Sequence, residues 1–255
     1  MSVRVGRLKY INGKKGQLPE YPGFSPIICL TKHSPYGSLS PYELRDNQGR
    51  CVENLWQFSK IYPKVPEVCK TRSRHDKTVI WQHHAEQHYQ NGTILPDYWK
   101  WRKKGMENDE PVRYPVTYDE EYRASCLGSI WLENRDPTEE FTNSLDTALD
   151  YIRARREIYV KLYEKYVVDQ SQFKELVNRL ENGEKLLIIE VDGPHQESLS
   201  FYKNKYGVKD DFIVNDTVEA SPENLDILLN DPRHPYGHGY CLAGALLSAI
   251  QKINV

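Results

Sequence analysis

Residues 185–192 read Lys-Leu-Leu-Ile-Ile-Glu-Val-Asp, and this stretch decides the fold class. Its consecutive apolar residues place side chains on both faces of an extended chain, a pattern typical of a strand covered on both sides. Helical periodicity precedes it over 145–168 and 171–180, and an amphipathic helix rich in small residues is predicted over 240–252. We therefore predict an α+β fold, mostly helical, with a small central sheet.

The rest of the chain supplies shorter elements around that sheet. Residues 1–23 are polar and punctuated by glycine and proline, so we expect a loosely attached arm or edge strand there. One domain is then expected over 24–255. Its further predicted elements are a strand over 26–30, a helix over 51–62 ended by Pro63, a helix that starts at Pro96 or Asp97, and a short helix over 221–229.

The composition limits the classes of function. Lysine and arginine number 34 against 36 acidic residues, a net charge of -2, which argues against a general nucleic-acid coat and a polybasic membrane anchor. No stretch approaches the roughly 18 apolar residues needed to span a bilayer, and no signal-peptide core opens the chain. The 5 cysteines form no CxxC pair, which fits reduced thiols. We expect a cytoplasmic protein without membrane partners.

One face of the helix predicted over 51–62 carries Glu53, Gln57 and Lys60. At about 100° per residue these side chains lie within about 60° of one another, opposite the apolar stripe of the helix. Periodicity alone favours a solvated outer face. The alternative is a site in which a carboxylate, an amide and an amine act together.

Three blocks of the chain, in order, carry a family resemblance. Residues 38–42 (SLSPY) and 52–60 (VENLWQFSK) are similar to a Leu-Ser-Asn-Phe-type segment followed by a Val-Glu-His-x-x-Gln-x-x-Lys helix. Residues 158–192 are similar to a helix, helix and strand block, and residues 231–247 to closing Asp, Trp-Gly-x-Gly and Leu-Gly elements. Over roughly 30–255 the chain thus resembles the YbiA-like NADAR superfamily. It departs from that pattern at Pro41, Asn54 and Tyr236, where the family has Asn, His and Trp.

The resemblance implies hydrolysis of the C1′–N bond between a base and a ribose, without cofactor or metal. The implied substrate is an ADP-ribosylated guanine or a phosphoribosylated, nucleobase-like compound, free or carried on nucleic acid. Because positive charge develops on the ribose, a buried carboxylate stabilises the transition state and a proton donor helps the base to leave. We predict catalytic roles for Glu53, Lys60 and Glu190. Lys60 can donate a proton or attack the anomeric carbon through an imine, and both roles stay open.

Other residues are candidates for holding the substrate. Gln57 would bind ribose hydroxyls or the base edge, aromatic side chains would stack the base, and the glycines before the last helix would receive a phosphate. The predicted binding set is Ser40, Tyr42, Gln57, Trp99, Asp192, Asp231, Tyr236, Gly237 and His238. Further phosphate candidates are Arg72, Arg74 and Arg113, and a local basic groove is predicted around Arg72, Arg74, Lys100, Arg102, Lys103 and Lys104.

Each of these assignments has a simpler alternative. Helix capping explains Glu190 and Asp192 equally well, a plain turn explains the glycines, and core packing explains at least one of Trp99 and Trp101.

Two other functions compete with the glycosidase. One is a non-catalytic module of the same fold that binds NAD or ADP-ribose derivatives. The other is a metallohydrolase, because a helix carrying His84 and His88 could offer two imidazoles to a metal, and His234 and His238 repeat this four-residue spacing. Neither pair has the HExxH order, and a helix is not expected to run through the second pair.

Overall fold

The computed structural model of the chain describes residues 2–9, 16–31, 33–67, 83–117, 119–132 and 143–253. The chain divides into two compact units, which we describe one at a time. Unit 1 comprises residues 1–44 and 160–255, and unit 2 comprises residues 45–159. Helices and strands occur in both, which confirms the predicted α+β class. No helix in the described ranges is long and apolar enough to cross a membrane.

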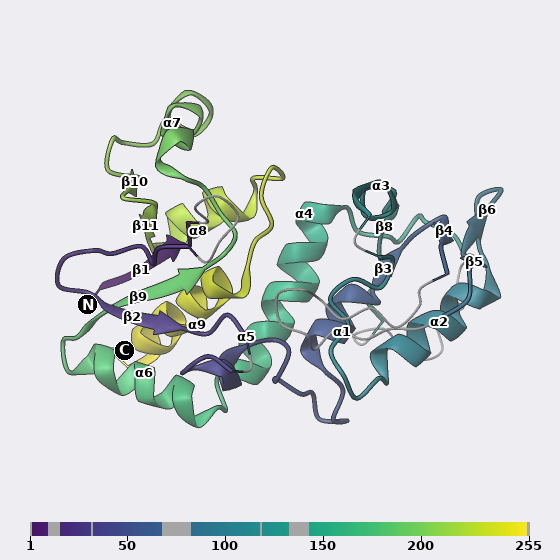
Figure 1. Cartoon of the computed structure of the whole chain (residues 1–255), viewed down its shortest axis with the longest axis horizontal. Helices are drawn as coiled ribbons and strands as arrows, with labels where there is room; N and C mark the ends of the chain where they lie inside the picture. Colours follow the sequence, from purple (N-terminus) through teal and green to yellow (C-terminus); the bar gives the residue numbers. More distant parts are fainter. Residues whose placement is uncertain are drawn as a thin grey trace. The chain divides into compact units, whose positions relative to one another are not determined.

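Unit 1 contains a five-stranded mixed sheet with the order β10-β11-β1-β9-β2 (Figure 1). Within this sheet β9 lies between β1 and β2 and runs parallel to both, whereas β11 is antiparallel to β1 and to β10. Every residue of β9 after the first is buried, as the apolar run predicts. The strands are β1 (Ser2–Arg7), β2 (Ser25–Ile28), β9 (Lys185–Glu190), β10 (Ile213–Val214) and β11 (Thr217–Glu219).

The first strand differs from the terminal arm or edge strand expected over 1–23. It lies between β9 and β11, and Val3 and Val5 are only 2% and 1% exposed. This strand also buries a charged residue, Arg4, which is 5% exposed. Its guanidinium is satisfied within the fold, because Nε donates to Thr217 Oγ1 at 2.9 Å and the group lies 4.1 Å from the centroid of the Tyr21 ring.

The last helix of unit 1, α9 (His238–Ile253), packs against β1 and β9 and also contacts α5, α6 and α8. The helix predicted over 221–229 is confirmed as α8, with Ser221 Oγ accepting a hydrogen bond from the Asn224 amide at 3.1 Å. The other helices are α5 (Lys161–Val167), α6 (Ser171–Glu181), α7 (Leu199–Tyr206) and α8 (Pro222–Leu229), with 3-10 turns at Gly37–Leu39 and Gln196–Ser198.

Unit 2 has an aromatic core around its longest helix, α2 (Pro96–Met106). Tyr98 and Trp101 are buried, and the Phe58 ring centroid lies 4.6 Å from that of Trp101. Gly105 permits this packing, because a Cβ there would lie 2.1 Å from the Phe58 ring. The remaining elements are α1 (Val52–Gln57), α3 (Glu120–Ala124), α4 (Tyr151–Ala154), and the ladders β3 (Lys60–Ile61) with β8 (Gly128–Ser129), β4 (Lys64–Val65) with β5 (Glu86–Gln87), and β6 (Tyr89–Gln90) with β7 (Thr93–Ile94).

Two predicted helices have different bounds in the structure. The helix predicted over 51–62 ends at Gln57, and the chain continues into β3. At this helix end Ser59 Oγ donates a hydrogen bond to the Trp56 carbonyl at 2.8 Å. The helix predicted over 145–168 begins only at Tyr151, the first residue of α4. There the Asp150 carboxylate accepts two backbone N–H bonds, each of 2.9 Å, and so caps the helix.

Candidate functional site

Three side chains predicted to act together are joined by hydrogen bonds in unit 2. Gln57 Nε2 donates to Glu53 Oε1 at 2.8 Å, and Lys60 Nζ donates to Gln57 Oε1 at 2.7 Å. Glu53 lies in the first turn of α1, Gln57 is its last residue, and Lys60 opens β3. The end of the helix at Gln57 therefore does not separate the three groups, and the Gln57 amide connects a carboxylate to an amine.

The Glu53 residue is only 5% exposed, so α1 does not present it on a solvated outer face. Its place in the first turn of a helix is electrostatically favourable for a carboxylate. A negative charge withdrawn from water interacts more strongly with a nearby developing positive charge than an exposed one does. Glu53 thus has the environment expected of a group that stabilises a cationic transition state.

The amine of Lys60 is held over the Trp56 ring, 4.5 Å from its centroid. Burial is the main influence on the Lys60 pKa and lowers it from the ordinary value. The positive charge of Arg155 lowers the pKa further, whereas Cys126 and Glu53 act in the opposite direction. A lowered pKa makes the ammonium a better proton donor and increases the share of nucleophilic amine.

The residue that packs beside Trp56 belongs to a π-helical turn, Arg155–Val160, which directly follows α4. The Tyr159 ring centroid lies 5.2 Å from that of Trp56. Arg155 is 1% exposed, and its guanidinium lies 4.0 Å from the centroid of the Tyr151 ring. Such turns occur frequently at functional sites. Arg155 was not among the predicted site residues, although one signal was present in the sequence: this arginine follows Ile152 by three residues, where helical periodicity would place another apolar side chain.

Asn54, at the position where the motif that the chain resembles has histidine, has a structural role. Its side chain is buried, and Nδ2 donates to the carbonyls of Asn108 and Glu110, each at 3.0 Å. Its Oδ1 accepts a bond from the Val112 amide at 2.7 Å. Asn54 therefore fastens the segment after α2 to the helix that carries Glu53.

Trp99 also belongs to unit 2, but it lines a surface pocket that includes none of Glu53, Gln57 and Lys60. Arg113 lies near an aromatic side chain, with its guanidinium 5.3 Å from the centroid of the Tyr114 ring. Two predicted phosphate ligands, Arg72 and Arg74, lie outside the described residues. Ser40 and Tyr42 belong to unit 1, where both are buried and the Tyr42 amide donates to Ser40 Oγ at 3.4 Å.

The third predicted catalytic residue, Glu190, ends β9 in unit 1 and is 1% exposed. Its carboxylate accepts bonds from the amides of Val191 and Gly239, each at 2.7 Å. A Cβ at Gly237 would lie 2.3 Å from Glu190 Oε2, so the glycine permits this close approach. The Glu190 carboxylate therefore accepts one amide of the first turn of α9, that of Gly239, which supports the capping interpretation of Glu190.

His238, the first residue of α9, completes this contact. Its Nδ1 lies 3.8 Å from Glu190 Oε2, and its Nε2 donates to the Cys29 carbonyl at 2.8 Å. Burial opposes a charged imidazole, but the negative charge of Glu190 and the bond to Cys29 outweigh it and raise the pKa of His238 to about 10. His238 and Glu190 thus form a buried ion pair at the start of the helix.

The other predicted ligands in unit 1 also serve its internal contacts. The Asp231 carboxylate accepts bonds from Tyr202 Oη at 2.5 Å and from Arg233 at 2.7 Å. Burial opposes its charge, yet these bonds lower the pKa of Asp231 to about 2. The Tyr236 ring packs against Tyr240, with centroids 5.3 Å apart, and Tyr240 Oη donates to the Asp192 carbonyl at 3.3 Å.

The histidine pair predicted for a metal does not lie on a helix. His84 and His88 flank β5 in extended chain, which removes the geometric basis of the four-residue spacing. The side chain of His84 is 96% exposed, whereas that of His88 is fully buried with Nε2 3.1 Å from Glu86.

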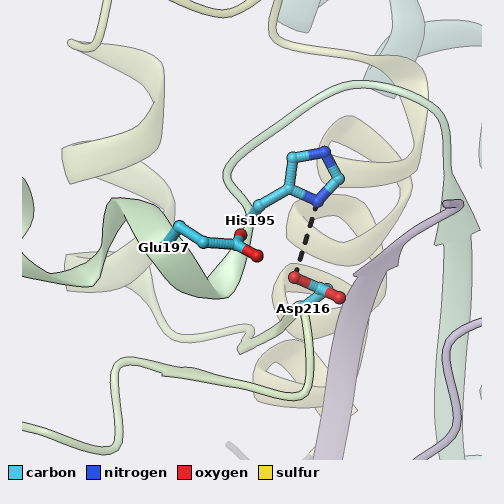
Figure 2. Close-up of side chains that lie close together, drawn as sticks. All are labelled: His195, Glu197 and Asp216. Carbon is cyan, nitrogen blue, oxygen red and sulfur yellow. Dashed lines mark ion pairs between the residues drawn. The ribbon is translucent and has the colours of Figure 1, made fainter.

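A different group in unit 1 has the composition of a metal site. Within the described ranges, His195, Glu197 and Asp216 bring their potential ligand atoms within 4.8 Å of one another (Figure 2). However, Lys9 Nζ forms an ion pair with one Asp216 oxygen, and the Gln196 amide donates to the other at 2.8 Å. The positive charge that Asp216 requires is therefore already supplied by the chain.

Comparison of the chain with protein-family models, with curated proteins and with solved structures finds no match. The resemblance to the YbiA-like NADAR superfamily therefore rests on the sequence motifs alone.

Proposed function

We propose that this chain is an N-glycosidase that hydrolyses the C1′–N bond of an ADP-ribosylated guanine or a phosphoribosylated nucleobase-like substrate. The observation that carries the proposal is the hydrogen-bonded series from Glu53 through Gln57 to Lys60, with the carboxylate buried. This series unites a group that stabilises positive charge with a group that moves a proton.

In the proposed reaction the C1′–N bond breaks, and the electron pair of that bond leaves with the base. Glu53 stabilises the positive charge on the ribose ring and orients the attacking water, whose oxygen becomes bonded to C1′ and whose released proton passes to the Glu53 carboxylate. The departing nitrogen takes a proton from Lys60, and proton exchange with solvent restores both groups. Gln57 acts as a positioning residue, because its amide is already used between the other two groups.

The alternative role of Lys60 is nucleophilic. In that route the amine nitrogen bonds to C1′ as the base leaves, the sugar opens to an imine, and water later releases it. Borohydride reduction separates the two routes, because it fixes an imine to the protein as a stable mass increase and leaves the proton-donor route untouched.

The experiment is incubation of the protein with ADP-ribosylated guanine in DNA, a phosphoribosylamino-pyrimidine, NAD and ADP-ribose, followed by mass spectrometry for the products of C1′–N cleavage. These products are ADP-ribose and unmodified DNA from the first substrate, and the free base and ribose phosphate from the second. Wild type should cleave one of the first two, whereas Glu53→Gln and Lys60→Met should not. Glu110→Gln and Lys64→Met are matched controls, because both replace exposed residues of unit 2, and they should retain activity. Thermal stabilisation by a ligand without release of base would instead indicate a binding module.

A further inference from the structure

Unit 2 contains a surface pocket of ≈ 250 Å³ that the proposed chemistry does not use. It lies along α2 and is bordered by the segment before α1. The lining includes Trp99, Arg102, Lys103, Met106, Glu107 and Arg50.

The sequence of α2 explains why these side chains meet. Trp99, Arg102, Lys103 and Met106 are spaced by three or four residues, so they share one helix face. Arg102 and Met106 are each 6% exposed, and both line the pocket. The Trp99 ring is fixed by a hydrogen bond from Nε1 to Asn143 Oδ1 at 3.2 Å. The pocket therefore has an apolar aromatic surface held in a defined orientation.

Positive charge predominates around this aromatic surface. Its lining has three cationic side chains and one carboxylate, that of Glu107. Asp46 pairs with Arg50 at 2.7 Å, and one bond of Arg102 is donated to the Ile130 carbonyl at 3.3 Å. Lys103 is exposed and makes no ion pair with any residue that the structure describes.

A planar ring beside cations selects for one ligand chemistry. Aromatic side chains bind the faces of heterocycles with little dependence on their identity, and lysine and arginine bind phosphate. The volume lies just below the range of about 300 to 1,000 Å³ usual for whole drug-sized ligands, so it suits a ring system with its charged group at the rim.

We propose that this pocket binds a heteroaromatic ring that carries a phosphate group, of the size of a nucleoside monophosphate. The ring lies against Trp99, and the phosphate lies at the rim near Lys103. The pocket lining shares no residue with the proposed catalytic group, and binding there requires no reaction at Glu53.

Isothermal titration calorimetry of the full chain with adenosine monophosphate tests this proposal, with adenosine and inorganic phosphate as the two partial ligands. We expect adenosine monophosphate to bind more tightly than either part. Trp99→Leu should weaken its binding by at least about tenfold through loss of stacking. Lys103→Ala should weaken it about threefold, as expected for one exposed charge.

Lys64→Ala is the matched control, because it removes a positive charge from an exposed position of unit 2 outside the pocket lining. It should leave the affinity unchanged, and Trp99→Phe should restore most of what Trp99→Leu loses. The proposal is overturned if adenosine monophosphate does not bind at millimolar concentration, if adenosine binds equally well, or if Lys64→Ala weakens binding as much as Lys103→Ala. Glu53→Gln should bind the nucleotide normally, so this result is independent of the glycosidase proposal.

Discussion

Raising the pH should destabilise unit 1, because deprotonation of His238 removes the positive charge of its buried ion pair with Glu190. The folded-state pKa of His238 is raised from the ordinary 6.5 to about 10. The stabilisation is therefore fully present below pH 6.5 and is lost as the pH rises through about 10. Between these two pH values the folded protein keeps the His238 proton and the unfolded protein does not, so unfolding releases one proton. The free energy of unfolding should therefore fall by up to about 1.4 kcal/mol per pH unit, or about 5 kcal/mol in all.

The assay is urea denaturation at pH 6.5, 8 and 9.5, followed by far-ultraviolet circular dichroism. All 5 tryptophans lie between residues 56 and 131, so tryptophan fluorescence reports unit 2 in the same samples. Glu190→Gln removes the carboxylate that raises the pKa of His238, and it should abolish most of the pH dependence of unit 1. Glu181→Gln, at an exposed position of α6, should retain it. Equal pH dependence in wild type and Glu190→Gln would refute the reasoning.

Substitutions at three positions test packing and capping by shifts in the midpoint of urea unfolding. Gly237→Ala should cost about 1 to 3 kcal/mol, because its Cβ would lie 2.3 Å from the Glu190 carboxylate; a neutral effect would contradict this contact. Ser221→Ala should cost about 1 kcal/mol through loss of the cap of α8, and Ser221→Asp should restore it. Asn54→Ala removes three hydrogen bonds and should cost about 3 kcal/mol in the fluorescence-detected transition; a loss below about 1 kcal/mol would show that water replaces them.

The sequence predicted those elements whose periodicity is local and uninterrupted. The apolar run of β9, the stripe of α6 and the Ser-Pro start of α8 each agree with the structure. The segment of β1 was expected to be an arm or an edge strand, whereas it lies inside the sheet between β9 and β11. Only the partners in β11 and at Tyr21 show how the charge of Arg4 is satisfied there. A single sequence gives no sign of such distant partners.

For the candidate site, too, local spacing indicated some of the residues, and the rest depend on features that are not local in the sequence. The spacing of Glu53, Gln57 and Lys60 indicated a common location, and their hydrogen bonds are consistent with it. The position of Arg155 depends on a π-helical turn, which ordinary helical periodicity does not describe. The contact of Glu190 with α9 joins positions 49 residues apart, so local patterns could not reveal it.

The most direct test of the proposed function is the rate of C1′–N cleavage by wild type and Glu53→Gln in water enriched in ¹⁸O, with ADP-ribosylated guanine in single-stranded DNA and the phosphoribosylamino-pyrimidine as the two substrates. We expect wild type to cleave one of them and to place the heavy oxygen on C1′ of the ribose product, which is free ADP-ribose if the DNA is the substrate. Glu53→Gln should be slower by at least about 100-fold. Equal rates for both proteins would contradict the role of Glu53, and no cleavage of either substrate would contradict the glycosidase itself.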